Sequence, residues 1–165
     1  MTLPEPTPTS RRRPVLGLVC CFCFLAAGCA ADTDFIDFST LARSSTPNDA
    51  LACPAGFCPA KVDLVTGTVP LAAAALSAKV IETLANEPRT ELVARDAAGL
   101  KLVFVQRSRL FRFPDTVNIA ITPIGGDAAG LAIYSRSNYG HGDLGVNAAR
   151  VQDWLAKFGV PAGAN

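Results

Sequence analysis

Residues 90–137 contain four short stretches with the composition of β-strands, and this run limits the fold more than any other part of the chain. The four candidates are residues 90–95, 100–108, 116–124 and 131–137. Short turns join them, of which residues 96–99 and 125–130 are rich in Gly and Ala. Turns this short connect antiparallel neighbours, because parallel strands need a crossover of a dozen or more residues. The sequence therefore predicts an antiparallel sheet.

Two segments with helical periodicity flank these strands. Residues 71–86 place Leu76, Val80 and Leu84 along one side, after a candidate N-cap at Thr68. A second helix is expected after Gly145, with Asn147 as its N-cap. Its apolar stripe at spacing i, i+3, i+4, i+7 is formed by Val151, Trp154, Leu155 and Phe158.

A weakly alternating stretch, residues 61–66, adds one short strand before the first helix. The expected order is therefore β-α-β-β-β-β-α. This order predicts an α+β fold, in which an antiparallel sheet of four to five strands carries two helices packed on one face.

The N-terminal region has the pattern of a secretory signal. Three arginines at positions 11–13 precede an apolar run, residues 15–28, that is too short for a membrane span of about 20 residues. The run ends in LAAGC, which resembles a bacterial lipoprotein processing site, although Ala26 stands where such sites usually have Leu. In such sites cleavage precedes the cysteine, whose sulfur receives a diacylglycerol. We expect Cys29 to be the lipidated N-terminus, anchored in the membrane on the periplasmic side of a bacterial envelope.

The remaining boundaries follow from composition. Residues 1–28 are the expected signal peptide, and residues 29–50 a flexible tether, because they are polar and end in Ser, Thr and Pro turns. Within them, Phe35, Ile36 and Phe38 either dock on the domain or lie loosely at the membrane surface. Residues 51–160 are the expected single α+β domain, and residues 161–165 a disordered C-terminus.

Two cysteines, Cys53 and Cys58, belong to the expected domain. In an exported protein, two cysteines separated by Pro and Gly most simply form a disulfide that closes a tight loop. Half of a metal site and a redox-active thiol pair are the alternatives. A metal would need further ligands, with His141 as the only imidazole, and redox motifs normally have two intervening residues.

Most of the uncommon polar chemistry lies in residues 107–115 and 134–150. The candidate residues are Arg107, Arg109, Arg112, Asp115, Arg136, Asp143, Asn147 and Arg150. Our first interpretation is a structural network of Arg–Asp pairs that locks strand ends to the last helix, with Asp143 and Asn147 bracing the helix entry. The alternative is a pocket in which the arginines, the Gly-rich loop and the helix N-terminus bind a small anion or lipid headgroup.

The same residues carry a resemblance to a known family. RSRLFRFPD, then a strand, then SRSNYGHGDLGVNAARV resembles the bacterial and plastid family named domain of unknown function 1499. The matching positions are Ser135-Arg136-Ser137, Asp143-Leu144-Gly145, Asn147 and Arg150. The resemblance covers roughly residues 48–158. It implies an exported or membrane-associated protein in many members, and it implies no activity.

Catalysis and nucleic-acid binding find little support in the sequence. His141 lies near Tyr139, Asp143, Ser135 and Ser137, but there is no nucleophile elbow, and a hydrolase-like enzyme is the weakest interpretation. We assign no catalytic residue, metal or cofactor. Glu5 is the only acidic residue before Cys29 and three of the 15 Lys and Arg precede it, so the rest is nearly neutral and unlike a nucleic-acid-binding domain.

We therefore expect a membrane-tethered, non-catalytic accessory or interaction domain of the cell envelope. Its expected partners are the membrane, through Cys29, and an envelope protein. The alternative function is the binding of a small anionic ligand or lipid headgroup at the Arg- and Gly-rich end of the sheet.

Overall fold

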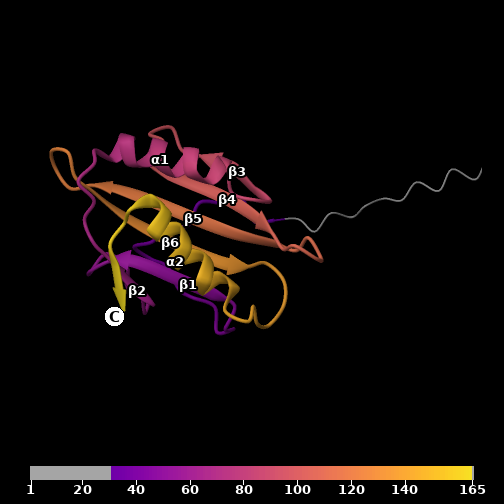
Figure 1. Ribbon diagram of the computed structural model, residues 1–165. Helices are drawn as coiled ribbons and strands as arrows, with labels where there is room; N and C mark the ends of the chain where they lie inside the picture. Colours follow the sequence, from indigo (N-terminus) through magenta and orange to yellow (C-terminus); the bar gives the residue numbers. More distant parts are fainter. Residues whose placement is uncertain (1–30, 165) are drawn as a thin grey trace, which may run out of the picture.

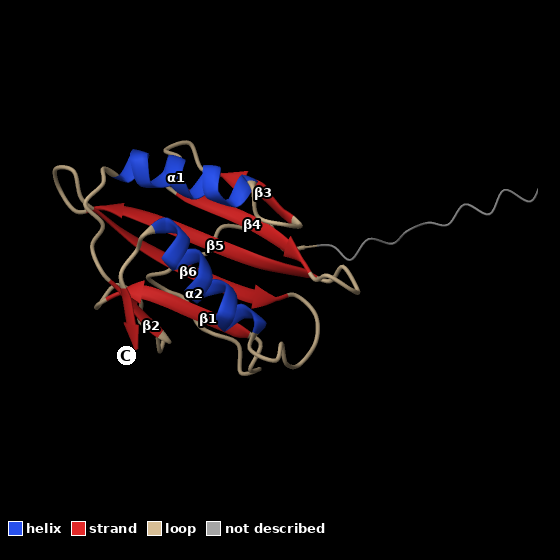
Figure 2. Cartoon of the chain, in the orientation of Figure 1, coloured by secondary structure: helices blue, strands red, loops and turns tan. Residues whose placement is uncertain are grey.

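The computed structural model describes residues 31–164, which form one twisted sheet with two helices on one of its faces (Figures 1 and 2). The predicted signal peptide and Cys29 lie outside the described residues. In chain order the elements are β1 (Asp49–Pro54), β2 (Leu64–Thr66), α1 (Ala73–Ala85), β3 (Thr90–Arg95), β4 (Lys101–Arg107), β5 (Pro114–Pro123), β6 (Ala129–Ser137), α2 (Val146–Phe158) and β7 (Ala162–Ala164). The predicted α+β class and the two helices on one face are confirmed.

The sheet is larger than predicted and mixed. Its seven strands have the order β3-β4-β5-β6-β1-β2-β7, and β1 pairs with β2 in parallel. The four strands β3 to β6 form the predicted antiparallel meander, with Ile119 opposite Ile133 in its centre. The prediction of four to five antiparallel strands was wrong because it missed β1 and β7. The sequence of β1, DALACP, has no alternating pattern, since all four of its central residues are buried.

The main core lies between the helices and the sheet. The predicted stripes of both helices are buried there, with Leu76, Val80 and Leu84 from α1 and Val151, Trp154, Leu155 and Phe158 from α2. The indole of Trp154 meets the ring of Phe104 on β4 edge to face, with 6.3 Å between the ring centroids. Such aromatic pairs contribute about 0.5–1.5 kcal/mol beyond the area they bury.

Residues 31–48, which we call the strap, lie on the opposite face of the sheet, and residues 57–62 pack on the same core. The backbone N–H of Ile36 donates to Oδ1 of Asn118 (3.2 Å), and the hydroxyl of Thr116 donates to the carbonyl oxygen of Asp32 (2.8 Å). Phe38 is 4% exposed and belongs to a second core with Leu51, Cys53, Ala132 and Tyr134. The segment that we expected to be a flexible tether is therefore docked on the sheet, because Ile36 and Phe38 bury apolar surface there.

The chain ends and helix starts differ from the sequence prediction in detail. Residues 162–164, expected to be disordered, pair with β2 as the short edge strand β7. Helix α1 begins at Ala73 without a side-chain cap, so Thr68 does not serve as its N-cap. Among residues 31–164, neither helix has the length and hydrophobicity that a membrane span requires.

Candidate functional site

The predicted polar residues lie at one end of the sheet, which we call the loop end. The loop between β4 and β5 (residues 108–113) and the loop between β6 and α2 (residues 138–145) both leave the sheet here. The strand register explains why: Arg107 pairs with Pro114, and Asp115 pairs with Ser137. Segments far apart in sequence therefore meet at one end of the sheet (Figure 1).

A buried guanidinium holds the centre of this end. Nη2 of Arg150 on α2 lies 2.6 Å from Oδ2 of Asp115 on β5, and both side chains are buried. Its other nitrogens donate to Oγ of Ser135, Oδ1 of Asn147 and Oε1 of Gln106, at 2.8, 2.5 and 2.6 Å. Four protein acceptors thus surround Arg150, which is the geometry of a structural network.

Asn147 extends this network to β1. Its Nδ2 donates to the carbonyl oxygen of Asn48 (2.9 Å), Oγ of Ser137 (3.1 Å) and Oδ2 of Asp143 (2.7 Å), and its Oδ1 accepts from the hydroxyl of Ser135 (2.6 Å). Asn147 was predicted to cap the helix, but it lies inside α2 and is fully buried. It joins the start of β1, the end of β6 and the helix.

Gly145 is the N-cap residue of α2, and the carboxylate of Asp143, two residues before it, accepts hydrogen bonds from the helix start. Its Oδ1 accepts from the N–H of Gly145 (3.0 Å) and its Oδ2 from the N–H of Asn147 (2.7 Å). Partial burial opposes ionisation, but these hydrogen bonds outweigh it and lower the pKa of Asp143 below its ordinary value. The helix N-terminus that was considered as an anion site therefore already holds a carboxylate of its own chain.

The four other predicted arginines lie outside this network. Arg136, half-exposed, forms an ion pair with Asp32 of the strap. Arg109 and Arg112 are exposed on the β4–β5 loop, with Arg107 at its base. No ion pair within residues 31–164 involves these three. The predicted cluster thus divides into a buried structural network and an exposed group of cations.

The β4–β5 loop also presents apolar side chains that the sequence analysis did not single out. Leu110 and Phe111 are 79% and 69% exposed, and Phe113 is 45% exposed. The rings of Phe111 and Phe113 stack with centroids 5.7 Å apart, and Phe113 meets Tyr139 of the neighbouring loop at 6.2 Å. The sequence feature that could have indicated this exposed surface is the mixture of Arg with Leu and Phe in residues 107–113.

The hydrolase-like arrangement is not assembled. His141 is exposed in the β6–α2 loop, whereas the hydroxyls of Ser135 and Ser137 are engaged with Asn147. Among residues 31–164, no group of His, Cys, Asp and Glu side chains is placed to hold a metal ion.

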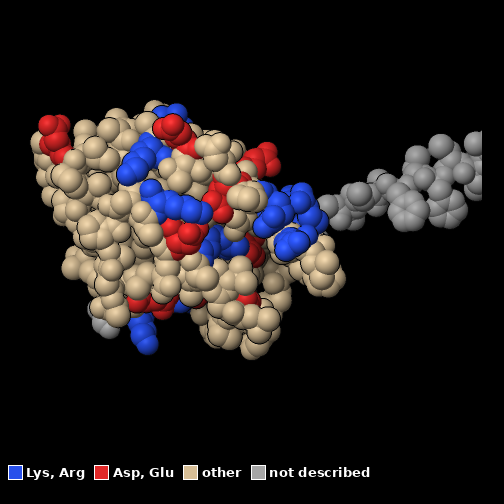
Figure 3. Space-filling view, in the orientation of Figure 1, with Lys and Arg blue, Asp and Glu red and all other residues tan. Residues whose placement is uncertain are grey.

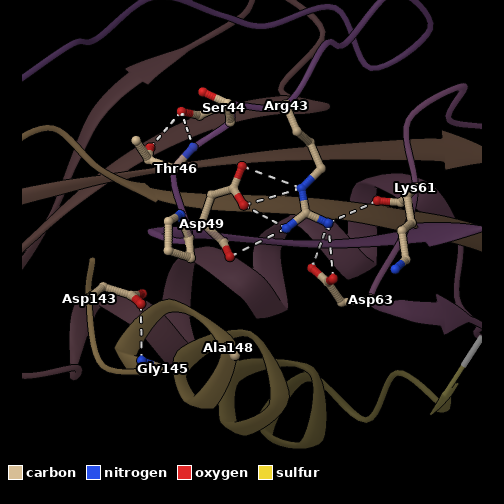
Figure 4. Close-up of a pocket in the computed structure, with 11 residues that line it drawn as sticks. Arg43, Ser44, Thr46, Asp49, Lys61, Asp63, Asp143, Gly145 and Ala148 are labelled. Atoms are coloured by element: carbon tan, nitrogen blue, oxygen red, sulfur yellow. Dashed lines mark hydrogen bonds and ion pairs between the residues drawn. The ribbon is translucent and has the colours of Figure 1, made fainter. Parts of the chain in front are cut away.

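A surface hollow of about 490 Å³ lies beside the loop end, between the strap and the start of α2 (Figure 4). Arg43 crosses it and forms ion pairs with Asp49 (2.6 Å) and Asp63 (2.9 Å). The hydroxyl of Tyr134 donates to Oδ2 of Asp49 (2.6 Å), and burial together with this carboxylate raises the pKa of Tyr134. The lining has more carboxylates than cations, and its one guanidinium is paired, so it does not suit an anion.

Comparison with known proteins identifies the family. A family model described as a protein of unknown function, DUF1499, matches residues 42–158. The chain belongs to the DUF1499 family. A search of curated proteins gave no match. A solved START superfamily protein from Mycobacterium smegmatis is 16% identical, covering 58% of this chain and 93% of its own, with a TM-score of 0.32.

Membership in the DUF1499 family confirms the resemblance seen in the sequence, and the structure shows what most of the motif residues do. Ser135, Asn147 and Arg150 lie in one hydrogen-bonded network, which also includes Asp115 and Asp143. In this DUF1499 domain, that part of the motif therefore joins the last helix to strands β1, β5 and β6.

The predicted disulfide between Cys53 and Cys58 is present, with a Cα–Cα distance of 6.2 Å. It closes the turn that follows β1 on the strap-covered face, beside Phe57 and Val62. With both sulfurs in this bond, the pair does not form half of a metal site.

Proposed function

We propose that this DUF1499 protein is a lipid-anchored domain of a bacterial cell envelope that works through contacts rather than catalysis. Its anchor is an acylated Cys29. Its partners are the membrane and an envelope protein, for which it serves as an accessory or interaction domain.

The observation that carries the proposal is the place where the chain joins the sheet. Asp32 is fixed at the loop end by the hydroxyl of Thr116 and by the ion pair with Arg136. Cys29 precedes Asp32 by three residues, which span about 10 Å when fully extended. An acylated Cys29 would hold the loop end within about that distance of the bilayer.

The absence of an assembled reactive group supports a role without catalysis. The polar residues of the loop end satisfy one another, and no buried side-chain nitrogen or oxygen within residues 31–164 lacks a hydrogen-bond partner. Active sites commonly keep strained or unsatisfied polar groups for the substrate. A network as complete as that of Arg150 fits a structural role better.

Acylation of Cys29 can be tested directly in a bacterial host. Cells fed an alkyne-bearing fatty acid should label the wild-type protein and the Cys23→Ala control, and should leave Cys29→Ala unlabelled. Cys23 is the control because it lies within the apolar run and not at its end. Absence of label from the wild-type protein would overturn the proposed anchor.

The protein partner needs a separate experiment. Crosslinking in intact cells, followed by affinity purification from solubilised membranes, should recover the same envelope protein with the wild type repeatedly. Recovery that is unchanged with an unrelated lipoprotein as bait would contradict an accessory role.

The second candidate function, binding of an anionic ligand or lipid headgroup, is favoured by one observation. Arg107, Arg109 and Arg112 are cations without an ion pair in the described part of the chain. At the Gly-rich loop, in contrast, the N-terminus of α2 is already occupied, because the N–H of Asn147 donates to Asp143. Any such site is therefore centred on the β4–β5 loop.

A further inference from the structure

We propose that residues 107–113, together with Tyr139, form a membrane-docking tip that inserts into the interfacial region of a bilayer containing anionic phospholipids. The orientation of the tip rests on the proposed anchor at Cys29. The tip adds a second contact with the bilayer, through side chains of the folded domain.

The apolar part of the tip is large for a loop of six residues. Leu110, Phe111 and Phe113 are all exposed, and stacking of Phe111 on Phe113 keeps the rings together instead of folding them onto the sheet. Tyr139 extends the aromatic surface through its contact with Phe113. Aromatic rings with polar neighbours are the side chains that favour the boundary between lipid headgroups and acyl chains.

The charge of the tip complements phospholipid headgroups. Arg107, Arg109 and Arg112 lie among the apolar residues, so insertion of the rings at the boundary would bring guanidinium groups near the phosphates. The nearest carboxylate in the sequence, Asp115, is engaged by Arg150 in the interior. Figure 3 shows Lys and Arg side chains gathered at this end of the molecule.

The chain enters the fold at this same end. Asp32, near the start of the strap, contacts Thr116 and Arg136, two residues paired across β5 and β6 close to the loop end. The opposite end of the sheet has a different character. Its β5–β6 turn, residues 124–128, contains Asp127 and no Lys or Arg. One end of the molecule is therefore suited to an anionic bilayer, and it is the end at which the described part of the chain begins.

Tryptophan fluorescence of the full lipidated protein in vesicles tests the docking. Phe111→Trp places a reporter on the tip, and Ile124→Trp places one at the opposite end, where Ile124 is 50% exposed. The native Trp154 is buried and gives a constant background. In vesicles of phosphatidylcholine and phosphatidylglycerol, brominated lipids should reduce the emission added by Phe111→Trp about twofold and leave that of Ile124→Trp unchanged.

The arginines are tested in the same background. Replacement of Arg107, Arg109 and Arg112 by Gln should remove most of this quenching in phosphatidylglycerol-containing vesicles. Higher salt should weaken it in the parent variant, because ions screen exposed charges. In vesicles of phosphatidylcholine alone, the emission of the Phe111→Trp variant should be quenched less than in the anionic vesicles.

The outcomes separate the tip from the anchor. Protein that stays with the vesicles but shows no quenching of Phe111→Trp would overturn the docking and leave the anchor standing. Equal quenching at positions 111 and 124 would also overturn it, because the contact would have no orientation. If Cys29 carries no lipid, full-length Cys29→Ala with Phe111→Trp, added to the same vesicles, still decides the docking: quenching supports it and its absence overturns it.

Discussion

Arg150 connects three parts of the molecule through one side chain. It extends from α2 to Asp115 on β5, Ser135 on β6 and Gln106 on β4. An ionised group in such a place is held only because its hydrogen bonds replace those of water. The buried acceptors around Arg150 therefore rely on its N–H groups for their hydrogen bonds, as the guanidinium relies on these acceptors.

Removal of this guanidinium should be costly. We expect Arg150→Met to lower the free energy of unfolding by about 3–5 kcal/mol, because Asp115 is left buried without its partner. The matched control is Arg136→Met, whose ion pair with Asp32 is partly exposed. It should cost no more than about 1 kcal/mol. Denaturant unfolding measures both, and equal losses would contradict the structural role of Arg150.

The cap of α2 gives a pH-dependent prediction. Asp143→Ala should cost about 1 kcal/mol at neutral pH, since the N–H groups of Gly145 and Asn147 lose their acceptor. Because the pKa of Asp143 is lowered in the folded state, its charge stabilises the protein above the unfolded pKa of about 4. This stability is lost as the pH falls through the folded pKa. The difference between the variants should therefore shrink below about pH 4 in urea unfolding.

The strap acts as a structural element although it contains no long strand or helix. Phe38 enters the second core beside Leu51 and Tyr134, whereas Phe35, three residues earlier, stays 42% exposed. The strap therefore closes the face of the sheet that the helices leave open.

This difference can be measured with two matched variants. Phe38→Ala should lower the free energy of unfolding by about 3–5 kcal/mol, and Phe35→Ala by less than about 1 kcal/mol. Thermal or denaturant unfolding distinguishes them. Similar values would mean that the strap contributes little to the core.

The disulfide between Cys53 and Cys58 closes the turn that follows β1. Replacement of Cys53 and Cys58 by Ala should cost about 2 kcal/mol, the value expected from loop entropy for a ring this small. Unfolding of the wild-type protein in the presence of a reductant should show a similar loss. An unchanged midpoint would show that the bond does not constrain the unfolded chain.

The elements that could be predicted are those with a local signal. The alternation of Val117, Ile119 and Ile121 and the stripe of Trp154 and Phe158 each reflect a neighbouring surface, so both were found. The strand β1 was missed because neither of its partners gives a local signal. Ser135 on β6 lies far away in sequence, and Leu64 on β2 pairs with β1 in parallel, which needs a crossover. The eight candidate residues were chosen by residue type, but spacing along the chain could not show that Arg150 is buried while Arg109 and Arg112 are exposed.

At the scale of the whole molecule, the meander β3–β6 is assembled from neighbours in sequence, while β1 pairs with β6 across about 80 residues. Contacts between distant residues form late, because closing a long loop costs entropy. We expect amides of β4 and β5 to become protected before those of β1 in pulse-labelled hydrogen exchange during refolding. Protection of β1 first would contradict this order.

The position of β1 between β6 and β2 has a consequence for synthesis. Ribosomes make the strap and β1 before the other elements of the domain, yet the strand on which they pack, β6, ends at Ser137. Until β6 has been made, the apolar side chains of β1 and the ring of Phe38 have no surface on which to pack. We therefore expect nascent chains to expose this segment until β6 has been made, and such chains should be substrates for chaperones that hold unfolded polypeptides.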